Sequence, residues 1–423
     1  MKQERNKSAK NKVEANLNTK GTNKNKDDTT DNRSESKTQE STTQFKAHFR
    51  FIYYLLPCIF LSTIGYIFMN HNSDNQIIYI TALAAISYFI TIFAINSCME
   101  SHKEHGFSGV DLNKGFDPKT GPRIPESMGL ESSAIMVGLV IITTVFLQTK
   151  EKIYRGLISI ILTTFLGFAD DVLNIRWRVK ILIPFFSVLP LILDYDGPTT
   201  ICLKGILSPL HKLFNFIAVD NENIDIGYLY LIYIFCLFVF CTHSINIYAG
   251  INGLEVGQSL ITAIFLLYHA SRDWETEEGS RAAVYLLVPF IFTTYALLYS
   301  NWFPSKVFVG DTFTLTAGAV IATAGILSHS VEMTLLFMMP ELINFTLSFP
   351  QLIGIVKCPR HRLPTYNPET KKLVGQKHNL NLVNYWLILF GPKNEERLFI
   401  ELLFFQILCC VSALGVRHLY LYS

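Results

Sequence analysis

The chain has 423 residues, of which 50% are hydrophobic and 17% are charged, and its formal net charge at pH 7 is +2. Apolar runs of about 20 residues recur along it, and a helix of that length spans about 30 Å of hydrocarbon. A membrane β-barrel is excluded, because its strands would appear as short alternating segments. The eight cysteines form no CxxC pair, so we expect neither a disulfide framework nor a zinc site. The sequence predicts an all-α fold, a polytopic membrane helix bundle of about ten or eleven transmembrane helices.

The N-terminal segment differs in composition from the rest of the chain. Residues 1–46 are mostly Lys, Asn, Thr, Ser, Glu and Asp, and such a segment cannot bury enough apolar surface to offset the entropy of ordering. We expect a disordered, polar cytosolic tail, followed by a transmembrane transferase domain over residues 47–423. The lysines of the tail alternate with acids and no aromatic residue precedes Phe45, so we expect a solvated tail and no nucleic-acid binding.

The apolar runs define about eleven candidate spans. In chain order they cover residues 48–69, 77–98, 129–149, 155–170, 179–194, 228–247, 253–270, 281–300, 312–329, 331–356 and 398–421. The pair over 312–356 is divided only by Ser328-His329-Ser330.

The distribution of lysine and arginine predicts the orientation. With a cytosolic tail, the cytosolic loops are about 99–128, 171–178, 248–252, 301–311 and 357–397. The last of these loops is rich in lysine and arginine, and the opposite loops are poorer in both. Because cytosolic loops carry an excess of positive charge, this orientation is favoured. It also places every polar cluster described below on one face of the membrane.

The first cluster follows the span at 155–170. It places acid, amide, aromatic and amine side chains three or four residues apart: Asp170, Asp171, Asn174, Trp177 and Lys180. If the helix continues, these side chains share one face. Ionisable groups at membrane depth are costly and mark functional sites by default. A solvated helix end with aromatic and arginine anchors is the alternative.

The loop 99–128 holds a second polar cluster. Asp111-Leu112-Asn113-Lys114 is followed by Arg123-Ile124-Pro125-Glu126-Ser127. The simpler interpretation is that Pro-Glu-Ser begins the next helix, with Glu126 near the positive end of its dipole.

The segment 241–255 leads an apolar helix into two asparagines and two glycines, among them Asn246, Gly250 and Asn252. Non-helical backbone at membrane depth is tolerated only where it lines a cavity or a wet groove. Glycine allows a ligand to approach the backbone closely, and an asparagine oxygen is a hard ligand suited to Mg²⁺. The alternative is a helix-breaking turn in which His243 is an interior histidine.

Phe308 and Asp311 stand at the start of a later helix. Asp311 is either an N-cap or the carboxylate that completes a Mg²⁺ site with Asn246. Phe308 offers a flat face to a planar base.

Arg360-His361-Arg362 opens the largest cytosolic loop between two prolines, so the backbone there is predicted to be extended. Arginine grips phosphate in a bidentate manner, although two arginine anchors of the positive-inside rule would look the same. Together the clusters suit a Mg²⁺–pyrophosphate substrate that meets a lipid-borne group.

Four motifs resemble those of the polyprenyl-phosphate N-acetylhexosamine-1-phosphate transferases, and the likeness runs from about residue 77 to the end of the chain. They are Gly-Phe-Ala-Asp-Asp-Val-Leu-Asn-Ile-Arg-Trp-Arg at 167–178, Asn-x-x-x-Gly-Ile-Asn-Gly-Leu-Glu at 246–255, Val-Phe-Val-Gly-Asp-Thr-Phe at 307–313 and Pro-Arg-His-Arg at 359–362. Among the branches of this family, the chain is most similar to the eukaryotic one, which uses dolichyl phosphate.

The resemblance implies an activity and a place in the cell. The expected reaction transfers GlcNAc-1-phosphate from UDP-GlcNAc to dolichyl phosphate and yields dolichyl-diphosphate-GlcNAc and UMP, the start of lipid-linked oligosaccharide synthesis for N-glycosylation. It implies the endoplasmic reticulum membrane, a site that faces the cytosol and inhibition by tunicamycin. We also expect a homodimer.

The resemblance also implies the roles of individual residues. The implied ligands of Mg²⁺, or of Mn²⁺ in its place, are Asn246 and Asp311. The implied UDP contacts are Asp111, Leu112, Glu126, Gly250, Asn252 and Phe308. Those of the sugar and pyrophosphate are Trp177, Arg360, His361 and Arg362. Those of the dolichyl phosphate are Lys180, Val239, His243 and Ile247. The catalytic group beside the reacting phosphates is Asp170, Asp171, Asn174 and Lys180.

Several alternatives remain open at this point. A phosphate monoester has a second pKa of about 6, so the lipid phosphate is mostly dianionic at neutral pH and can displace UMP without a strong base. In the rival mechanism, Asp170 or Asp171 is a covalent nucleophile or the base. The same chemistry on another UDP-N-acetylhexosamine or polyprenyl phosphate is one alternative function. A membrane transporter of an anionic substrate, with its site at the broken helix 246–253, is another.

Overall fold

The computed structural model describes residues 75–146, 151–173, 175–202, 223–359 and 361–422. The predicted tail over 1–46 and the predicted span over 48–69 lie outside the described residues. So do Asn174 and Arg360.

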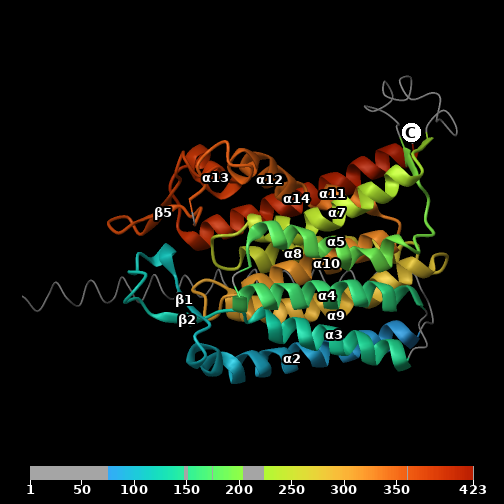
Figure 1. Ribbon diagram of the computed structural model, residues 1–423, viewed down its shortest axis with the longest axis horizontal. Coiled ribbons are helices and arrows are strands. Elements are labelled where there is room, and N and C mark those ends of the chain that lie inside the picture. The colour runs from blue at the N-terminus through green and yellow to red at the C-terminus, as the bar shows by residue number, and fades with distance from the viewer. Residues whose placement is uncertain (1–74, 147–150, 174, 203–222, 360, 423) are drawn as a thin grey trace, which may run out of the picture. The chain divides into compact units, whose positions relative to one another are not determined.

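Helices make up most of the described chain (Figure 1). They are α2 (Asn75–Glu104), α3 (Gly129–Phe146), α4 (Glu151–Leu173), α5 (Trp177–Ile192), α7 (Tyr228–Ile247), α8 (Leu254–Ser271), α9 (Glu278–Asn301), α10 (Gly310–Leu327), α11 (Val331–Phe337), α12 (Met339–Leu352), α13 (Leu382–Phe390) and α14 (Glu395–Tyr422), with the short 3₁₀ helix η1 (Leu112–Lys114). Most of the predicted spans therefore coincide with a helix of the structure.

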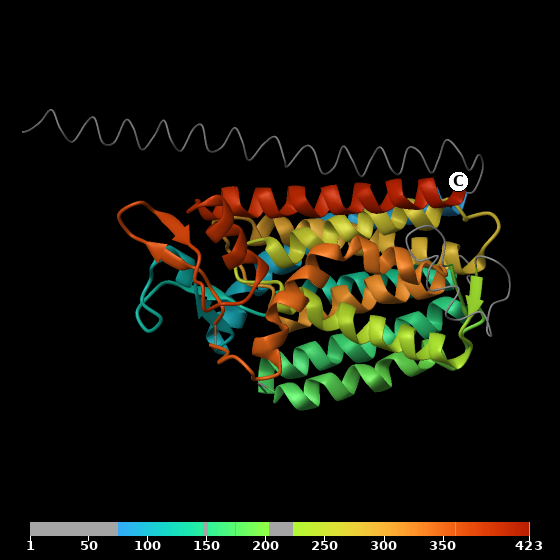
Figure 2. The same ribbon diagram turned by 90° about the horizontal axis from the view of Figure 1, so that it is seen from above.

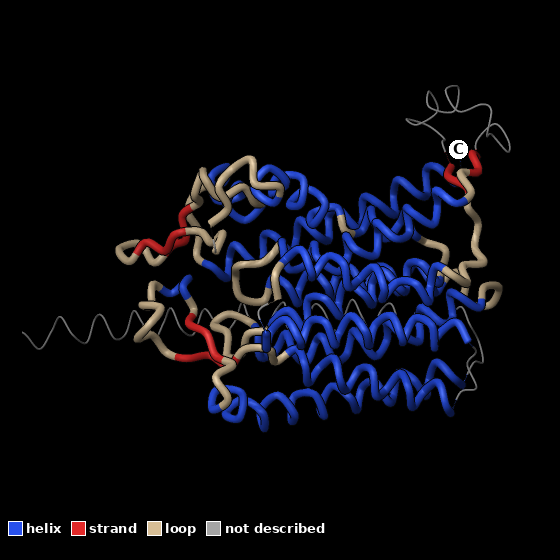
Figure 3. The backbone as a smooth tube through the Cα atoms, in the orientation of Figure 1, coloured by secondary structure: helices blue, strands red, loops and turns tan. Residues whose placement is uncertain are grey.

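The strands of the described residues are short antiparallel pairs in the connecting loops. They are β1 (Ser108–Val110) with β2 (Arg123–Pro125), β3 (Thr200–Cys202) with β4 (Asn223–Asp225), and β5 (Thr365–Asn367) with β6 (Lys372–Val374). Figure 3 shows them beyond the two ends of the helix bundle. The all-α class is therefore confirmed, with hairpins confined to the loops.

Six of the described helices are long and apolar enough to cross a membrane, and two shorter apolar helices lie within α3 and α5. The six are α2, α4, α7, α9, α10 and α14. The protein is thus a polytopic helical membrane protein, while the predicted number of ten or eleven spans is not established.

The predicted single span over 331–356 is wrong in its geometry. The segment forms two helices, α11 and α12, which meet at Met338. Pro340 occupies the first turn of α12, and because proline has no backbone N–H, a helix readily begins there but does not continue through it.

Helix α10 is the centre of the bundle and packs against α3, α4, α7, α8 and α9. In its most apolar stretch 89% of the residues are buried, compared with 28% in α2. Its sequence is rich in Gly, Ala and Thr, and small side chains allow membrane helices to approach closely. A Cβ atom on Gly318 would lie 2.2 Å from the carbonyl oxygen of Cys241 in α7. The contact between α7 and α10 therefore depends on this glycine.

The cytosolic loops predicted from the sequence meet at one end of the bundle. The views of Figures 1 and 2 agree that the loops with β1, β2, β5 and β6 lie at one end, while α14 finishes at the other. Helices α4 and α7 end beside the loops of the first end, and α10 begins there. This arrangement brings segments that are distant in sequence to a common rim.

We predict that Gly318→Ala lowers the stability of the protein, because the added methyl group collides with the backbone of α7. Overpacking of this kind costs about 1–3 kcal/mol. The matched control is Gly138→Ala in α3, where a Cβ atom would meet nothing within 4 Å and alanine favours the helix by about 1 kcal/mol. In one detergent, the melting temperature of Gly318→Ala should be below that of the wild type, and the melting temperature of Gly138→Ala should be equal to that of the wild type or higher. The reverse order would contradict the close α7–α10 contact.

Candidate active site

A cleft of about 980 Å³ opens where these loops meet. Its walls include residues of all four motifs and of the loop 99–128: Asp111, Leu112, Glu126, Asp170, Asp171, Lys180, Asn246, Gly250, Asn252, Phe308, Asp311 and His361. The prediction that the polar clusters share one face is therefore confirmed, and the structure unites them in one cavity.

The charged centre of the cleft joins α4, α5, α7 and α10. The Lys180 ammonium donates to a carboxylate oxygen of Asp311 at 2.8 Å and is ion-paired with Asp170. The Asn246 amide nitrogen lies 2.5 Å from the other Asp311 oxygen. Because the two ends of an amide are interchangeable in position, Asn246 can present either a donor or an oxygen ligand here. The predicted pair Asn246 and Asp311 is thus close enough to share a cation.

The helix does not continue from Asp170 to Lys180, so these residues do not form one helical stripe, and the predicted loop between the two spans is present. Helix α4 ends at Leu173, and α5 begins only at Trp177. The carboxylate of Asp170 accepts a hydrogen bond from the backbone N–H of Ile175 at 2.7 Å, and a side chain that captures a backbone donor in this way competes with the helix. Asp170 and Lys180 still meet, because the turn between the helices brings them together.

Asp171 has a different environment from Asp170. Its carboxylate accepts hydrogen bonds from the backbone N–H of Asp311 at 2.7 Å, from that of Thr312 at 3.0 Å and from the Thr312 hydroxyl at 2.6 Å. It therefore satisfies the N-terminus of α10, where a negative charge also interacts favourably with the helix dipole. The N-cap position belongs to Val309, so the interpretation of Asp311 as an N-cap is wrong.

Glu126 and Phe308 form one wall of the cleft. The backbone N–H of Phe308 donates to the Pro125 carbonyl at 2.8 Å, and the Phe308 carbonyl accepts from Met128 at 3.1 Å. A Cβ atom on Gly109 would overlap the Glu126 carboxylate and come within 3.4 Å of the Phe308 ring. Glu126 lies between β2 and α3, which begins at Gly129, so the prediction that Pro-Glu-Ser begins the helix is wrong by a few residues.

The Glu126 carboxylate is half-buried and close to another acid. Burial raises the pKa of this carboxyl, the charge of Asp171 raises it further, and Arg123 opposes the shift in part. Glu126 is therefore neutral at a higher pH than an ordinary glutamate is.

The turn Gly250–Asn252 also lines the cleft, and polar contacts hold it in place. Asn252 donates from its amide to Asp111 at 3.0 Å, and Asn113 donates to the Gly250 carbonyl at 2.7 Å. Asp111 lines the cleft, yet it is buried and also accepts from the backbone N–H of Asn113 at 3.1 Å. Its carboxylate thus stabilises the turn, which presents its backbone to the cavity.

Other predicted residues lie at or beyond the edge of the cleft. Arg362 donates to the Ile247 carbonyl at 3.2 Å, where α7 ends, and its other terminal nitrogen is buried without a partner. Burial lowers the pKa of its guanidinium. His243 contacts the backbone of Lys180, and Val239, His243, Ile247 and Arg362 are outside the residues that line the cleft. Trp177 begins α5, although its side chain lies outside the described atoms.

The sequence analysis assigned no role to several residues that support the site. Thr312, Lys114 and Asn301 make contacts there, and Glu395 reaches it from the start of α14. Glu395 stands in a charged segment directly before an apolar run, which is typical of any membrane helix end. Only its tertiary contacts distinguish it.

The donor set at the centre of the cleft suits a hard divalent cation. Among the described residues, no group of three or more His, Cys, Asp or Glu side chains is arranged to hold a metal ion. Mg²⁺ needs no such cage, because it keeps several waters and binds through one or two protein oxygens together with substrate phosphates. The Asn246–Asp311 pair beside an open cavity fits that pattern.

Comparison with known proteins finds a matching family model and several similar enzymes. The family model for glycosyl transferase family 4 matches residues 153–329. The UDP-N-acetylglucosamine–dolichyl-phosphate N-acetylglucosaminephosphotransferase of Dictyostelium discoideum is 40% identical over 79% of this chain and 87% of its own length. The enzyme of the same name from Leishmania amazonensis is 32% identical over 79% and 91%. That of Schizosaccharomyces pombe is 30% identical over 84% and 94%.

We predict that Asp171→Asn destabilises the protein more than Asp170→Asn does. An asparagine at 171 has one acceptor oxygen and directs an amide N–H₂ at the donors of α10, which costs about 2 kcal/mol. Asparagine at 170 keeps the bond to Ile175, and Lys180 keeps Asp311 as a partner. Thermal unfolding of the purified variants measures the difference, with Thr312→Val as a milder variant that loses a single bond. Equal stability of the two asparagine variants would contradict the assigned role of Asp171.

Proposed function

The chain belongs to the family of UDP-N-acetylglucosamine–dolichyl-phosphate N-acetylglucosaminephosphotransferases, and from this premise we propose that it catalyses the reaction of that name. It transfers GlcNAc-1-phosphate from UDP-GlcNAc to dolichyl phosphate and releases UMP. The observation that carries the assignment is the single cleft at the end of a membrane bundle, in which Lys180, Asn246 and Asp311 meet. The relatives are named as transferases, and they favour this reading over a transporter.

The chemistry at the charged centre is a direct displacement. An oxygen of the lipid phosphate attacks the phosphorus that carries GlcNAc, the bond from that phosphorus to the UMP oxygen breaks, and UMP leaves with the bonding electrons. Both oxygens of Asp171 accept hydrogen bonds from α10, and Asp170 is bonded to Ile175 and Lys180. Both carboxylates are thus engaged in supporting contacts, which favours direct attack by the dianionic lipid phosphate over a covalent aspartyl intermediate.

The main barrier to this reaction is the repulsion between two anionic phosphates. Lys180 is placed at the centre of the cleft to offset it, because its side chain is still 23% exposed while it contacts Asp311. A bound Mg²⁺ would be held by Asn246 and Asp311 and would supply further charge compensation on the pyrophosphate. Catalysis of this kind depends on positioning and electrostatic stabilisation more than on covalent chemistry.

The opposite part of the cleft suits the nucleotide. Phe308 presents an aromatic ring, Glu126 a carboxylate able to accept hydrogen bonds from ribose hydroxyls, and the turn Gly250–Asn252 its backbone. Leu112 lines the same part. His361 lies at the rim, where the sugar and pyrophosphate would pass, and Arg362 lies behind it.

We further propose that the enzyme resides in the endoplasmic reticulum membrane with the cleft on the cytosolic side. The loops at the cleft end carry most of the lysine and arginine outside the tail, as the positive-inside rule requires. The lipid chain would enter between helices near Val239, His243 and Ile247 of α7. We also propose a homodimer, for which the mostly unburied helices α2 and α14 offer surfaces that a second copy or lipid would cover.

Release of UMP tests the reaction and its dependence on a divalent cation. We expect purified protein to release UMP from UDP-GlcNAc only with both dolichyl phosphate and Mg²⁺ present, and excess EDTA to stop the release. Mn²⁺ binding, followed by electron paramagnetic resonance without substrates, should weaken in Asn246→Ala, which removes the amide oxygen, and in Asp311→Asn, which removes the negative charge and one of the two carboxylate oxygens. Asn96→Ala, which changes an exposed amide in α2, is the control. Unchanged Mn²⁺ binding in both cleft variants would contradict the metal site.

The pH dependence of substrate binding tests Glu126. Because burial and Asp171 raise its pKa, the carboxylate becomes protonated, and loses its ability to accept two ribose hydroxyls, at a higher pH than a free glutamate would. We expect the KM for UDP-GlcNAc to rise as the pH falls through this region. Glu126→Gln should show a high KM that lacks the part of this rise caused by the protonation of Glu126. Titration of the lipid phosphate affects both proteins alike, so the difference between their profiles isolates Glu126. Parallel profiles of KM against pH for the wild type and Glu126→Gln would contradict the role of Glu126 in binding the ribose.

A further inference from the structure

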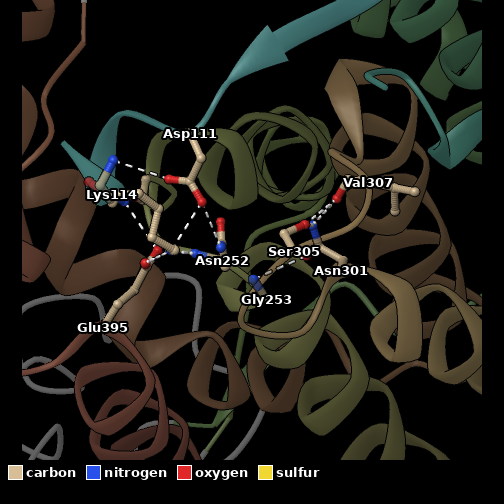
Figure 4. A network of polar contacts seen from close by, with 10 residues as sticks. Asp111, Lys114, Asn252, Gly253, Asn301, Ser305, Val307 and Glu395 are labelled. Carbon is tan, nitrogen blue, oxygen red and sulfur yellow. Dashed lines mark hydrogen bonds and ion pairs between the residues drawn. The ribbon is translucent and has the colours of Figure 1, made fainter. Parts of the chain in front are cut away.

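A buried carboxylate outside the four motifs reaches the cleft from the last helix. Glu395 stands in the first turn of α14 and is 4% exposed. Figure 4 shows its side chain directed at Lys114 and Asn252, with Asp111 on the far side of the same contacts. Neither the predicted motifs nor the proposed chemistry gives this residue a role.

The contacts of Glu395 join three segments that are far apart in sequence. One carboxylate oxygen accepts from the backbone N–H of Asn252 at 2.9 Å and from the Asn113 amide at 3.2 Å. The other oxygen is ion-paired with Lys114, whose ammonium also lies 3.0 Å from Asp111. The carboxylate thus links α14, the turn Gly250–Asn252 and η1.

These contacts stabilise charges that are largely removed from solvent. Both carboxylates that share Lys114 are buried, and a buried charge is tolerated only when it is paired and hydrogen-bonded. Lys114 also lies 4.2 Å from the centre of the Phe303 ring, which restricts its position. The cluster therefore has one well-defined arrangement, and the turn is part of it.

The contacts hold the turn at both ends. Asn113 binds the carbonyl of Gly250, while Glu395 binds the N–H of Asn252. Gly250 has a φ of +114°, a conformation that side chains rarely adopt. The next residue, Gly253, donates to Asn301 at 3.1 Å, and Asn301 donates to the Val307 carbonyl at 2.8 Å, directly before Phe308. Figure 4 shows this continuous chain of contacts from Glu395 to Val307.

We propose that Glu395 is a positioning residue for the nucleotide end of the cleft. It preorganises the turn Gly250–Asn252. Through Gly253 and Asn301 it also fixes the backbone at Val307, directly before Phe308, so that the uracil and ribose of UDP-GlcNAc meet a fixed surface. The assignment of this surface to the nucleotide rests on the proposed function. Because Glu395 contacts neither Lys180 nor the Asn246–Asp311 pair, it acts on the binding of the nucleotide and leaves the phosphoryl transfer unaffected.

The test separates the nucleotide from the lipid substrate. Glu395→Gln keeps one acceptor for Asn252 and removes the charge that pairs with Lys114. We expect the affinity for UDP, measured by calorimetry on the full-length protein, and the KM for UDP-GlcNAc to weaken about tenfold, as for the loss of a buried charged hydrogen-bond partner. The kcat and the KM for dolichyl phosphate should stay within about twofold. The matched control, Glu401→Gln, removes a carboxylate of the same helix that pairs with Lys393 and Arg397 and should leave all of these values unchanged.

A second variant keeps the inference testable if Glu395→Gln does not fold. Asn113→Ala removes the bonds to the Gly250 carbonyl and to Glu395 but leaves the ion pair between Glu395 and Lys114 in place. It should weaken the binding of UDP and UDP-GlcNAc in the same selective way, to a smaller extent. Unchanged UDP affinity in a folded variant, or an equal effect on kcat and on both substrates, overturns the positioning role. Calorimetry with UDP needs no turnover, so a wild-type protein that binds UDP but releases no UMP would refute the proposed function while the role of Glu395 is still decided.

Discussion

The bond between Asp171 and the N-terminus of α10 is the contact on which the rest of the site depends. Two backbone N–H groups and one hydroxyl of α10 donate to this carboxylate, and α4 carries it to the exposed end of the bundle. Without the carboxylate, helix donors would stand unsatisfied at the edge of a membrane, which is costly. The bond aligns α4 with α10, and Asp170 and Asp311 thereby come within reach of one lysine. Gly310 and Gly167 permit the approach, because a Cβ atom on either would collide with the other element.

The two adjacent aspartates therefore have different functions, although the sequence presents them as a pair. Consecutive residues of a helix point in directions about 100° apart, so one carboxylate turns toward α10 and the other toward the turn that precedes α5. Asp170 contributes charge to the centre of the cleft, and Asp171 stabilises the helix that carries Asp311.

Hydropathy was sufficient to predict the membrane bundle, and the spacing of the apolar runs was sufficient to predict that the polar clusters lie at one end of it. The break after α7 was also predictable, because Gly250 and Gly253 interrupt an apolar helix. The break at Met338 was missed, since the apolar run continues through it. The different contacts of Asp170 and Asp171 could not be predicted from the sequence, because the first donor to Asp171 lies 140 residues later. Glu395 is 143 residues from Asn252 and its local sequence resembles any charged helix start.

Two lysines, each shared by two carboxylates, divide the cleft into parts with different behaviour. Lys114 pairs Asp111 with Glu395, whose side chains are 5% and 3% exposed, while Lys180 pairs Asp170 with Asp311, which is 25% exposed. Both carboxylates of the first cluster are buried while Lys114 is 19% exposed, and their charge-assisted bonds stabilise one backbone arrangement. The second is open on one side and has the Asn246 amide beside it, so its lysine is able to exchange carboxylate partners for substrate phosphate. A rigid nucleotide end next to an adaptable charged centre is the arrangement that phosphoryl transfer requires, because the substrate must be held still while charge moves between phosphates.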